Sequence, residues 1–264
     1  MYETIHGVLS DRKGGEIFRC FSPVHFLYII AAICGVIVIC LLARKKSREK
    51  KDKIAAILIN TVFGMYIADF FLMPFAYEYI DIEKLPFHAC TATCVACFLS
   101  RHTAFFGRYK TQFALLGLVS NFVYLIYPAG VMWHAVHPLS YRVIQTLLFH
   151  ALMSVYCLIT LIFERDGISC KNACRALATV SLMTIWAVIG NLLYTGKAGT
   201  YEGDFNWFFV TADPFGMIDP KIAPYVMPLI DIAVFFAVEM GVYMIFYLIS
   251  RIKNAKKLEI KKSI

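Results

Sequence analysis

Seven apolar stretches, each close to the roughly 20 residues that a helix needs to cross a bilayer, dominate the 264-residue chain. In lipid a spanning segment must satisfy its own backbone polar groups, so helices are expected. The sequence therefore predicts an all-α polytopic membrane protein, a bundle of seven transmembrane helices in one integral membrane domain over residues 1–264. The spans are expected near 23–43, 54–76, 86–106, 111–132, 141–163, 174–195 and 224–250. The main alternative is six spans with a re-entrant seventh segment.

The composition agrees with this class, because 59% of the residues are hydrophobic and only 17% are charged, against about 25% charged in soluble proteins. A net charge of +8 would suggest nucleic-acid binding in a soluble protein. Here the basic residues lie between apolar runs, so no nucleic-acid partner is expected. Most of the nine cysteines fall inside spans, where thiols behave as small hydrophobes, and no metal or cofactor is expected.

The distribution of Lys and Arg predicts the orientation in the cell membrane. Nineteen of the 26 basic residues fall in the odd-numbered connections and the tail, and seven in the even-numbered set. Because basic loops stay cytoplasmic, the N-terminus is expected outside and the C-terminus inside. The basic run 44–53 is interpreted as the stop signal of the first span, with binding of anionic lipid headgroups as the alternative. Membrane lipids are the expected partners, and the oligomeric state stays open.

The third span combines a histidine with thiols on an apolar segment. Three thiols follow at i, i+4 and i+7 and share one face: Cys90, Cys94 and Cys97. Pro86 is expected in the first helical turn. His88 lies about 200° round the helix from Cys90, so it is not expected to activate that thiol directly. Arg101 and His102 are expected to reach toward the cytoplasmic surface.

Ionisable residues of several spans share a depth in the membrane. At about 1.5 Å per residue, five of them fall in the outer half: His25, Asp69, His88, His150 and Asp231. Such groups are costly in lipid and normally face a bundle interior or a wet cavity. The sequence therefore predicts one polar pocket that opens outward, with helix-packing hydrogen bonds as the alternative. Glu239 is deeper and is interpreted as a relay acid or a protonated structural residue.

Two asparagines extend the predicted pocket. Asn121 lies on a polar stripe of the fourth span, and Asn206 belongs to the apolar segment 204–210 before the last span. That segment is interpreted as a lid or re-entrant piece, or alternatively as an interfacial loop.

Short motifs in order along most of the chain resemble the YwaF family of bacterial integral membrane proteins. They are Phe21-Ser22-Pro23-Val24-His25, Leu85-Pro86-Phe87-His88-Ala89-Cys90, Phe149-His150 and Asn206-Trp207-Phe208-Phe209. That family is related to a eukaryotic transmembrane acyltransferase family that remodels phospholipids, so the resemblance implies lipid acyl chemistry. His88 and His150 correspond to family positions. The eukaryotic relatives carry their nucleophilic cysteine immediately before the histidine, where this chain has Phe87, so Cys90 does not match it.

Two classes of function fit these observations. The first is lipid acyl transfer or hydrolysis, with His88 or His150 as general base and Cys90 as the candidate thiol; His150 is the better base for Cys90. The second is a small-solute or proton-coupled transporter or binding protein. It would use the residues of the same pocket: His25, Asp69, Asn121, Asn206 and Asp231. Whether the protein is an enzyme stays open at this point.

Overall fold

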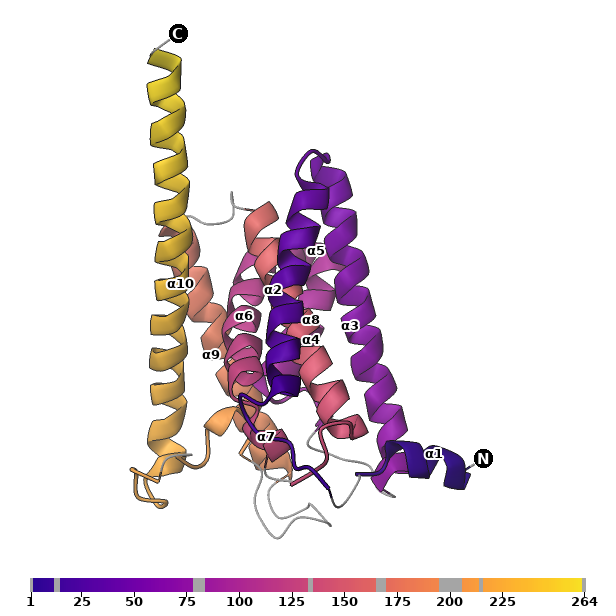
Figure 1. The fold of residues 1–264 in the computed structure, drawn as a ribbon. Coiled ribbons are helices and arrows are strands. Elements are labelled where there is room, and N and C mark those ends of the chain that lie inside the picture. Colours follow the sequence, from indigo (N-terminus) through magenta and orange to yellow (C-terminus); the bar gives the residue numbers. More distant parts are fainter. Residues whose placement is uncertain are drawn as a thin grey trace.

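The computed structural model describes residues 2–11, 15–77, 84–132, 135–164, 170–194, 206–213 and 216–262. Over these ranges the chain is helical and contains no strand, which confirms the all-α prediction there. The helices form one elongated bundle (Figure 1). In chain order they are α1 (Tyr2–Leu9), α2 (Pro23–Ala43), α3 (Arg48–Tyr77), α4 (Ala89–His102), α5 (Ala104–Gly107), α6 (Lys110–Ile126), α7 (Ala129–Met132), α8 (Tyr141–Phe163), α9 (Cys170–Tyr194), the 3₁₀ turn η3 (Trp207–Phe209) and α10 (Ala223–Lys262).

Six of the described helices are long and apolar enough to cross a membrane. Their spans are Pro23–Ala43, Arg48–Phe75, Lys110–Met132, Tyr141–Phe163, Cys174–Tyr194 and Ala223–Ile249. The first and the fourth of these coincide with the predicted 23–43 and 141–163. The start of α2 is specified locally, because Pro23 takes the first helical position and the Ser22 hydroxyl accepts a hydrogen bond from the His25 N–H.

The predicted third span, 86–106, is shorter than expected. Helix α4 has 14 residues, or about 21 Å at 1.5 Å per residue, against about 30 Å of hydrocarbon. It ends because Thr103 is extended (φ −131°, ψ 141°) and its hydroxyl caps α5 by accepting from the Phe106 N–H. At the other end His88 is the N-cap. The prediction that Pro86 lies in the first helical turn is therefore wrong.

Helix α8 is the centre of the bundle. It packs against α2, α3 and α6, and α4 lies against α3 and α6. Helices α9 and α10 pack on each other and on α6, with α10 at the edge of the bundle (Figure 1). Helices α2 and α10 leave most of their apolar surface exposed, as expected for helices that face lipid.

The chain ends lie at opposite ends of the bundle, with the described N-terminal residues near the start of α2 and the C-terminal turns of α10 beyond the other end (Figure 1). The two bundle ends are named here after the charged residue at each: the Lys84 end and the Arg101 end. Helices α4 and α5 carry the chain from the first to the second. Arg101, in the last turn of α4, meets Asp52 at the start of α3 and Glu164 just after α8.

The segment before the last helix is inserted into the bundle at the Lys84 end. Trp207 is 0% and Phe208 2% exposed, whereas Phe209 is 42% exposed. Asn191 of α9 holds this turn with two hydrogen bonds, one from the Trp207 N–H and one to the Trp207 carbonyl, both 3.1 Å. The interfacial-loop interpretation of 204–210 therefore does not describe the 206–210 part; residues 204–205 lie outside the described residues.

Candidate functional site

A buried carboxylate and an ammonium group form the centre of the polar groups at the Lys84 end. Lys84 Nζ lies 3.0 Å from Asp69 Oδ2, and the Asp69 side chain is 2% exposed. The Tyr141 hydroxyl donates to Asp69 Oδ1 at 2.9 Å, and the Tyr66 hydroxyl donates to the Lys84 carbonyl at 2.7 Å. Both carboxylate oxygens are thus satisfied, and the Lys84 backbone is held against α3.

His150 of α8 is buried and only half satisfied. Its Nδ1 lies 2.8 Å from the Thr146 carbonyl; a carbonyl only accepts, so Nδ1 carries the proton and Nε2 of the neutral ring is a free acceptor. No hydrogen-bond partner of Nε2 occurs in the part of the chain that the structure describes. The ring stacks on Tyr124 of α6 with centroids 4.1 Å apart, which fixes its orientation.

His88 and Cys90 enter the same neighbourhood from the start of α4. Lys84 is close enough to His88, Cys90 and His150 to interact electrostatically with each of them, and the two imidazoles also interact with each other. His88 has extended backbone angles (φ −71°, ψ 147°). The prediction of a 200° separation from Cys90 assumed that both residues are helical, so it does not apply.

These residues are referred to below as the Lys84 cluster. Its members come from α3, the turn before α4, the first turn of α4, and α8: Tyr66, Asp69, Lys84, His88, Cys90, Tyr141 and His150.

A line of further unsatisfied groups leads from His150 into the bundle. Ser154, one turn along α8, has a buried hydroxyl without a partner among the described residues, and the same holds for Asn121 Oδ1 of α6. The Asn121 amide donates to the Gly117 carbonyl at 2.8 Å and lies 3.5 Å from the Thr93 hydroxyl. Three buried polar atoms on α6 and α8 that lack partners among the described residues, two acceptors and one hydroxyl, are unusual in a well-packed interior and suit a polar ligand or water.

His25 does not join the Lys84 cluster. Its Nε2 donates to the Leu125 carbonyl at 2.7 Å, and its Nδ1 accepts from the Phe21 N–H at 2.9 Å. Both ring nitrogens are used, and the side chain is 0% exposed. Cys20 lies beside it, and burial raises the pKa of the Cys20 thiol. His25 therefore fastens the start of α2 to the end of α6.

The other two predicted pocket residues also lie apart. Asn206 is occupied by its own loop, where its Oδ1 accepts from Thr211 and Ala212 and its Nδ2 donates to the Ala212 carbonyl. Asp231 is on α10, 7% exposed, with one oxygen that lacks a partner within the described ranges. Helix α10 packs on α9, α6 and η3. Of the predicted site residues, the structure brings together Asp69, His88, Cys90 and His150.

An aromatic cluster positions the turn that carries His88. The Phe87 ring lies 4.9 Å from Trp207 and 5.0 Å from Trp186 between centroids, and the Trp186 indole donates to the Pro86 carbonyl at 2.7 Å. A Cβ on Gly190 would come within 2.3 Å of the Phe87 ring, so this approach requires glycine. The inserted segment thus helps to hold the turn that leads to His88.

A second polar group lies at the Arg101 end. Arg101 donates to the hydroxyls of Tyr156 (3.1 Å) and Thr160 (3.0 Å), pairs with Glu164 at 2.9 Å, and pairs with Asp52. Its side chain is only 1% exposed, so the prediction that it reaches out to the surface is wrong. Lys110 contacts the same two carboxylates. This set is called the Arg101 network: Asp52, Arg101, Lys110, Tyr156, Thr160 and Glu164.

Sequence reasoning missed Lys84, Tyr66 and Tyr141 as site residues. Lys84 was counted as one loop charge among others, although it is the only basic residue between the predicted second and third spans. A single lysine in this loop, only four residues before His88, could have indicated that Lys84 belongs to the site. No group of three His, Cys, Asp or Glu able to hold a metal ion occurs among the described residues. The chemistry that the cluster offers is proton transfer at His150 and nucleophilic attack by a thiol beside an ammonium group.

One family model, described as the TMEM164 family, matches residues 20–252 of the chain. The match covers every helix of the bundle described above except α1 and the last turns of α10. No curated protein and no solved structure matches the chain.

Proposed function

Since this chain belongs to the TMEM164 family of transmembrane proteins, we propose that it is a multi-pass protein of the cell membrane that transfers or hydrolyses acyl chains of membrane lipids, with His150 as general base. The observation that carries the proposal is His150 Nε2, which has no hydrogen-bond partner among the described residues. A buried, oriented imidazole with one nitrogen held by a carbonyl and the other unoccupied is the arrangement that a general base requires.

Cys90 is the nucleophile in this proposal, because its thiol and His150 both lie within electrostatic reach of Lys84. His150 Nε2 takes the thiol proton, and the sulfur attacks the acyl carbonyl of the lipid. The C–S bond forms as the C–O ester bond breaks, and the lysolipid oxygen leaves with the proton that His150 returns. A second lysolipid or water then takes the acyl group from sulfur. Lys84 stabilises the negative charge that develops during both steps.

The direct test uses purified protein in phospholipid nanodiscs with a labelled acyl chain. Release or transfer of the label is expected, and His150→Phe should lower the rate by about 10²–10⁴-fold, the usual contribution of a general base. Cys90→Ser should abolish a hydroxylamine-sensitive acyl adduct on the protein. The matched control is His102→Gln, because His102 is an exposed histidine paired with Asn60 at the Arg101 end. Equal rates in His150→Phe and wild type would contradict the proposal.

The second candidate is a small-solute or proton-coupled transporter that uses the same groups. It is favoured by the orphan acceptors of Asn121 and Ser154, which extend inward from His150 and which acyl chemistry at the Lys84 end does not require. Uptake into proteoliposomes that collapses in Asn121→Leu, without any acyl release, would select this function over the first.

The proposed topology has seven crossings, with the N-terminus and the Lys84 end outside and anionic lipid headgroups at the basic loops of the Arg101 end. It is supported by the excess of Lys and Arg there and by the passage of α4 and α5 between the two ends. A cysteine introduced at Arg48 in a cysteine-free background should be protected from an impermeant thiol reagent in whole cells. Labelling from outside would reverse the orientation.

A further inference from the structure

Helix α10 carries a buried carboxyl group that the proposed function does not use. Glu239 is 0% exposed, and neither carboxyl oxygen has a hydrogen-bond partner in the described ranges. It lies eight residues from Asp231, or about 12 Å along the helix, and well away from the Lys84 cluster. A buried carboxylate with nothing to compensate its charge is among the most costly groups that a membrane interior can hold.

The helices packed against this part of α10 supply no compensating charge. These are α6 and α9, together with η3 and, at the cavity, Leu161 of α8; η3 and Leu161 carry no charge. Residues 111–126 of α6 and 176–193 of α9 contain no Asp, Glu, Lys, Arg or His. The nearest cations along these helices, Lys110 and Arg175, lie at the Arg101 end. The titratable side chains of α10 itself inside the bundle are Asp231 and two tyrosines, Tyr243 and Tyr247. Glu239 therefore has to be neutralised by a bound proton or a bound cation.

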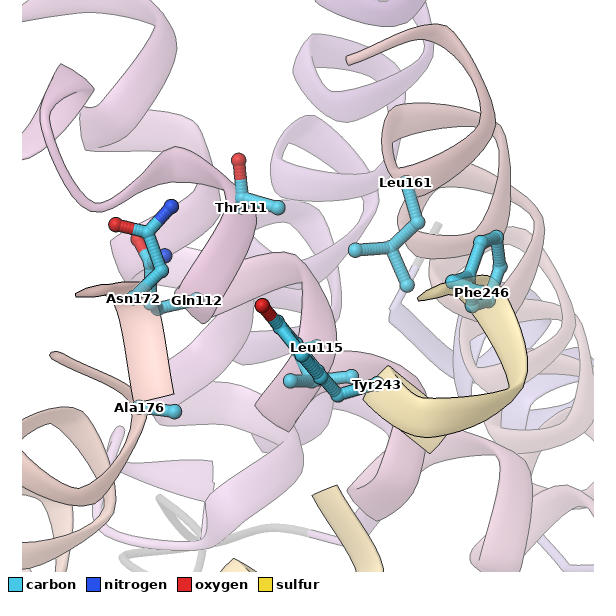
Figure 2. Close-up of a pocket in the computed structure, with 8 residues that line it drawn as sticks. All are labelled: Thr111, Gln112, Leu115, Leu161, Asn172, Ala176, Tyr243 and Phe246. Atoms are coloured by element: carbon cyan, nitrogen blue, oxygen red, sulfur yellow. The ribbon is translucent and has the colours of Figure 1, made fainter. Parts of the chain in front are cut away.

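A small cavity begins one helical turn from Glu239 on its Arg101 side. It has a volume of about 10 Å³, enough for about one water molecule. Figure 2 shows its lining, in which polar groups of α6 and α9 lie opposite Leu161 and Phe246. The lining residues are Thr111, Gln112, Leu115, Leu161, Asn172, Ala176, Tyr243 and Phe246. Tyr243 is at i+4 from Glu239, so the cavity and the carboxyl group lie along one face of α10.

The opposite direction is closed by aromatic packing. Phe235, one turn from Glu239 toward Asp231, stacks on Phe208 of the inserted segment with centroids 4.7 Å apart. Phe208 is itself 2% exposed. Water in the cavity can therefore come within about one helical turn of Glu239 from its Arg101 side, whereas the stacked rings of Phe235 and Phe208 lie on its Lys84 side.

From this arrangement we propose that Glu239 is a proton-binding site that exchanges its proton with the Arg101 end through the cavity at Thr111, Gln112 and Ala176. In the exchange a hydronium ion in the cavity gives its proton to a carboxylate oxygen: one O–H bond forms, one breaks, and neutral water remains. The site is separate from the Lys84 cluster and does not depend on the proposed acyl chemistry.

The test is infrared spectroscopy of the full-length protein in nanodiscs, with exchange from H₂O to D₂O. Wild type should show a protonated-carboxyl C=O band that is absent from Glu239→Gln and that shifts on exchange. Ala176→Leu, which fills the cavity, should slow the shift by about tenfold, equivalent to about 1.4 kcal/mol of added barrier. Ala178→Leu is the matched control, because it makes the same change on an exposed position of the same helix and should leave the rate unchanged.

Gln112→Leu provides a second cavity variant if Ala176→Leu does not fold; it removes a polar group from the lining and should slow the exchange in the same direction. The proposal is overturned if Glu239→Gln leaves the spectrum unchanged, or if the folded cavity variants exchange as fast as Ala178→Leu. It is also overturned if the band is absent in sodium-containing buffer and returns when sodium is removed at constant pH, because Glu239 would then hold a metal cation.

Discussion

The Lys84 cluster and the Arg101 network are both built from buried polar side chains, but they differ in how completely those side chains are satisfied. Each of the three guanidinium nitrogens of Arg101 meets a hydroxyl or a carboxylate. The Lys84 cluster instead leaves His150 Nε2 without a partner among the described residues, and the same holds for the Ser154 hydroxyl, one turn further along α8, and for Asn121 Oδ1 of α6. We call a network closed when its buried polar groups all have partners, and open when some lack them. A closed network stabilises the fold, whereas an open one can bind a ligand or take part in a reaction.

Removal of Arg101 should have the largest effect on stability. Arg101→Met removes one of the two cationic partners of Glu164, which keeps Lys110, and leaves the hydroxyls of Tyr156 and Thr160 without their donor. A broken buried ion pair costs about 3–5 kcal/mol. We expect about 3 kcal/mol, the lower end, because Asp52 is 52% exposed and can rehydrate. Unfolding titrations in mixed micelles measure the loss, and the double variant with Glu164→Gln should recover part of it. A loss below about 1 kcal/mol would mean that the network is not the closed structure described.

Both ring nitrogens of His25 have partners, although the residue lies at the Lys84 end. It therefore tests whether the pairing of a side chain or its position in the bundle determines if it takes part in function. His25→Ala strands the Leu125 carbonyl and the Phe21 N–H, each of which loses its hydrogen bond. An unsatisfied buried group costs about 1–3 kcal/mol, so we expect about 2 kcal/mol in total, since both groups lie near the bundle end. The same unfolding titration measures it, with Phe26→Ala on the exposed face of α2 as control. A stable His25→Ala that lost activity would place His25 in the site.

Two of the three thiols of α4, those of Cys94 and Cys97, are predicted to contribute to packing alone. Cys94 and Cys97 are 0% exposed and belong to the hydrophobic core, so Cys94→Ala and Cys97→Ala should each cost about 1 kcal/mol, as small core truncations do, and leave acyl release unchanged. Loss of activity with intact stability in either variant would show that the reactive thiol is not Cys90.

His150→Phe should change stability least and activity most. The Nδ1 bond is to Thr146 of the same helix, whose carbonyl keeps its α-helical partner, so the substitution leaves no backbone group stranded. Phe preserves the ring that stacks on Tyr124, and we expect a change below about 1 kcal/mol. If His150→Phe lowered the free energy of unfolding as much as His25→Ala does, His150 would be as important for stability as a fully paired residue, and the distinction between the two kinds of site would be wrong.

Most of the fold could be predicted from the sequence, because apolar run length and terminal breakers act locally. Helix α2 begins at Pro23, as Ser22-Pro23 predicts, and α8 begins at Tyr141, where the apolar residues begin. The short α4 could not be predicted this way. Residues 86–106 are apolar enough for a full span, but a Thr103 side chain that caps the next helix competes with helix continuation. That outcome depends on hydrogen bonds that hydropathy does not register.

The candidate site could be predicted only in part. Depth along the spans grouped Asp69, His88 and His150, because rise per residue converts position into depth. Depth alone also included His25 and Asp231, since it carries no information about which helices are neighbours. His25 meets Leu125, 100 residues away, and only tertiary packing decides that its nitrogens are both occupied.

The packing of α2 on α8 has a consequence for biogenesis. Helix α2 is the first long helix to be made and the most apolar, with a mean hydropathy of 3.0, but its main neighbour α8 ends 120 residues later. At about 5–20 residues per second, α2 waits in lipid for about 6–24 s before that surface can be covered. A segment this apolar tolerates the delay, because it needs no partner to remain inserted. The hydrogen bond from His25 to the Leu125 carbonyl at the end of α6 can form before α8 is complete. The contact between α2 and α6 can therefore be an early step of assembly.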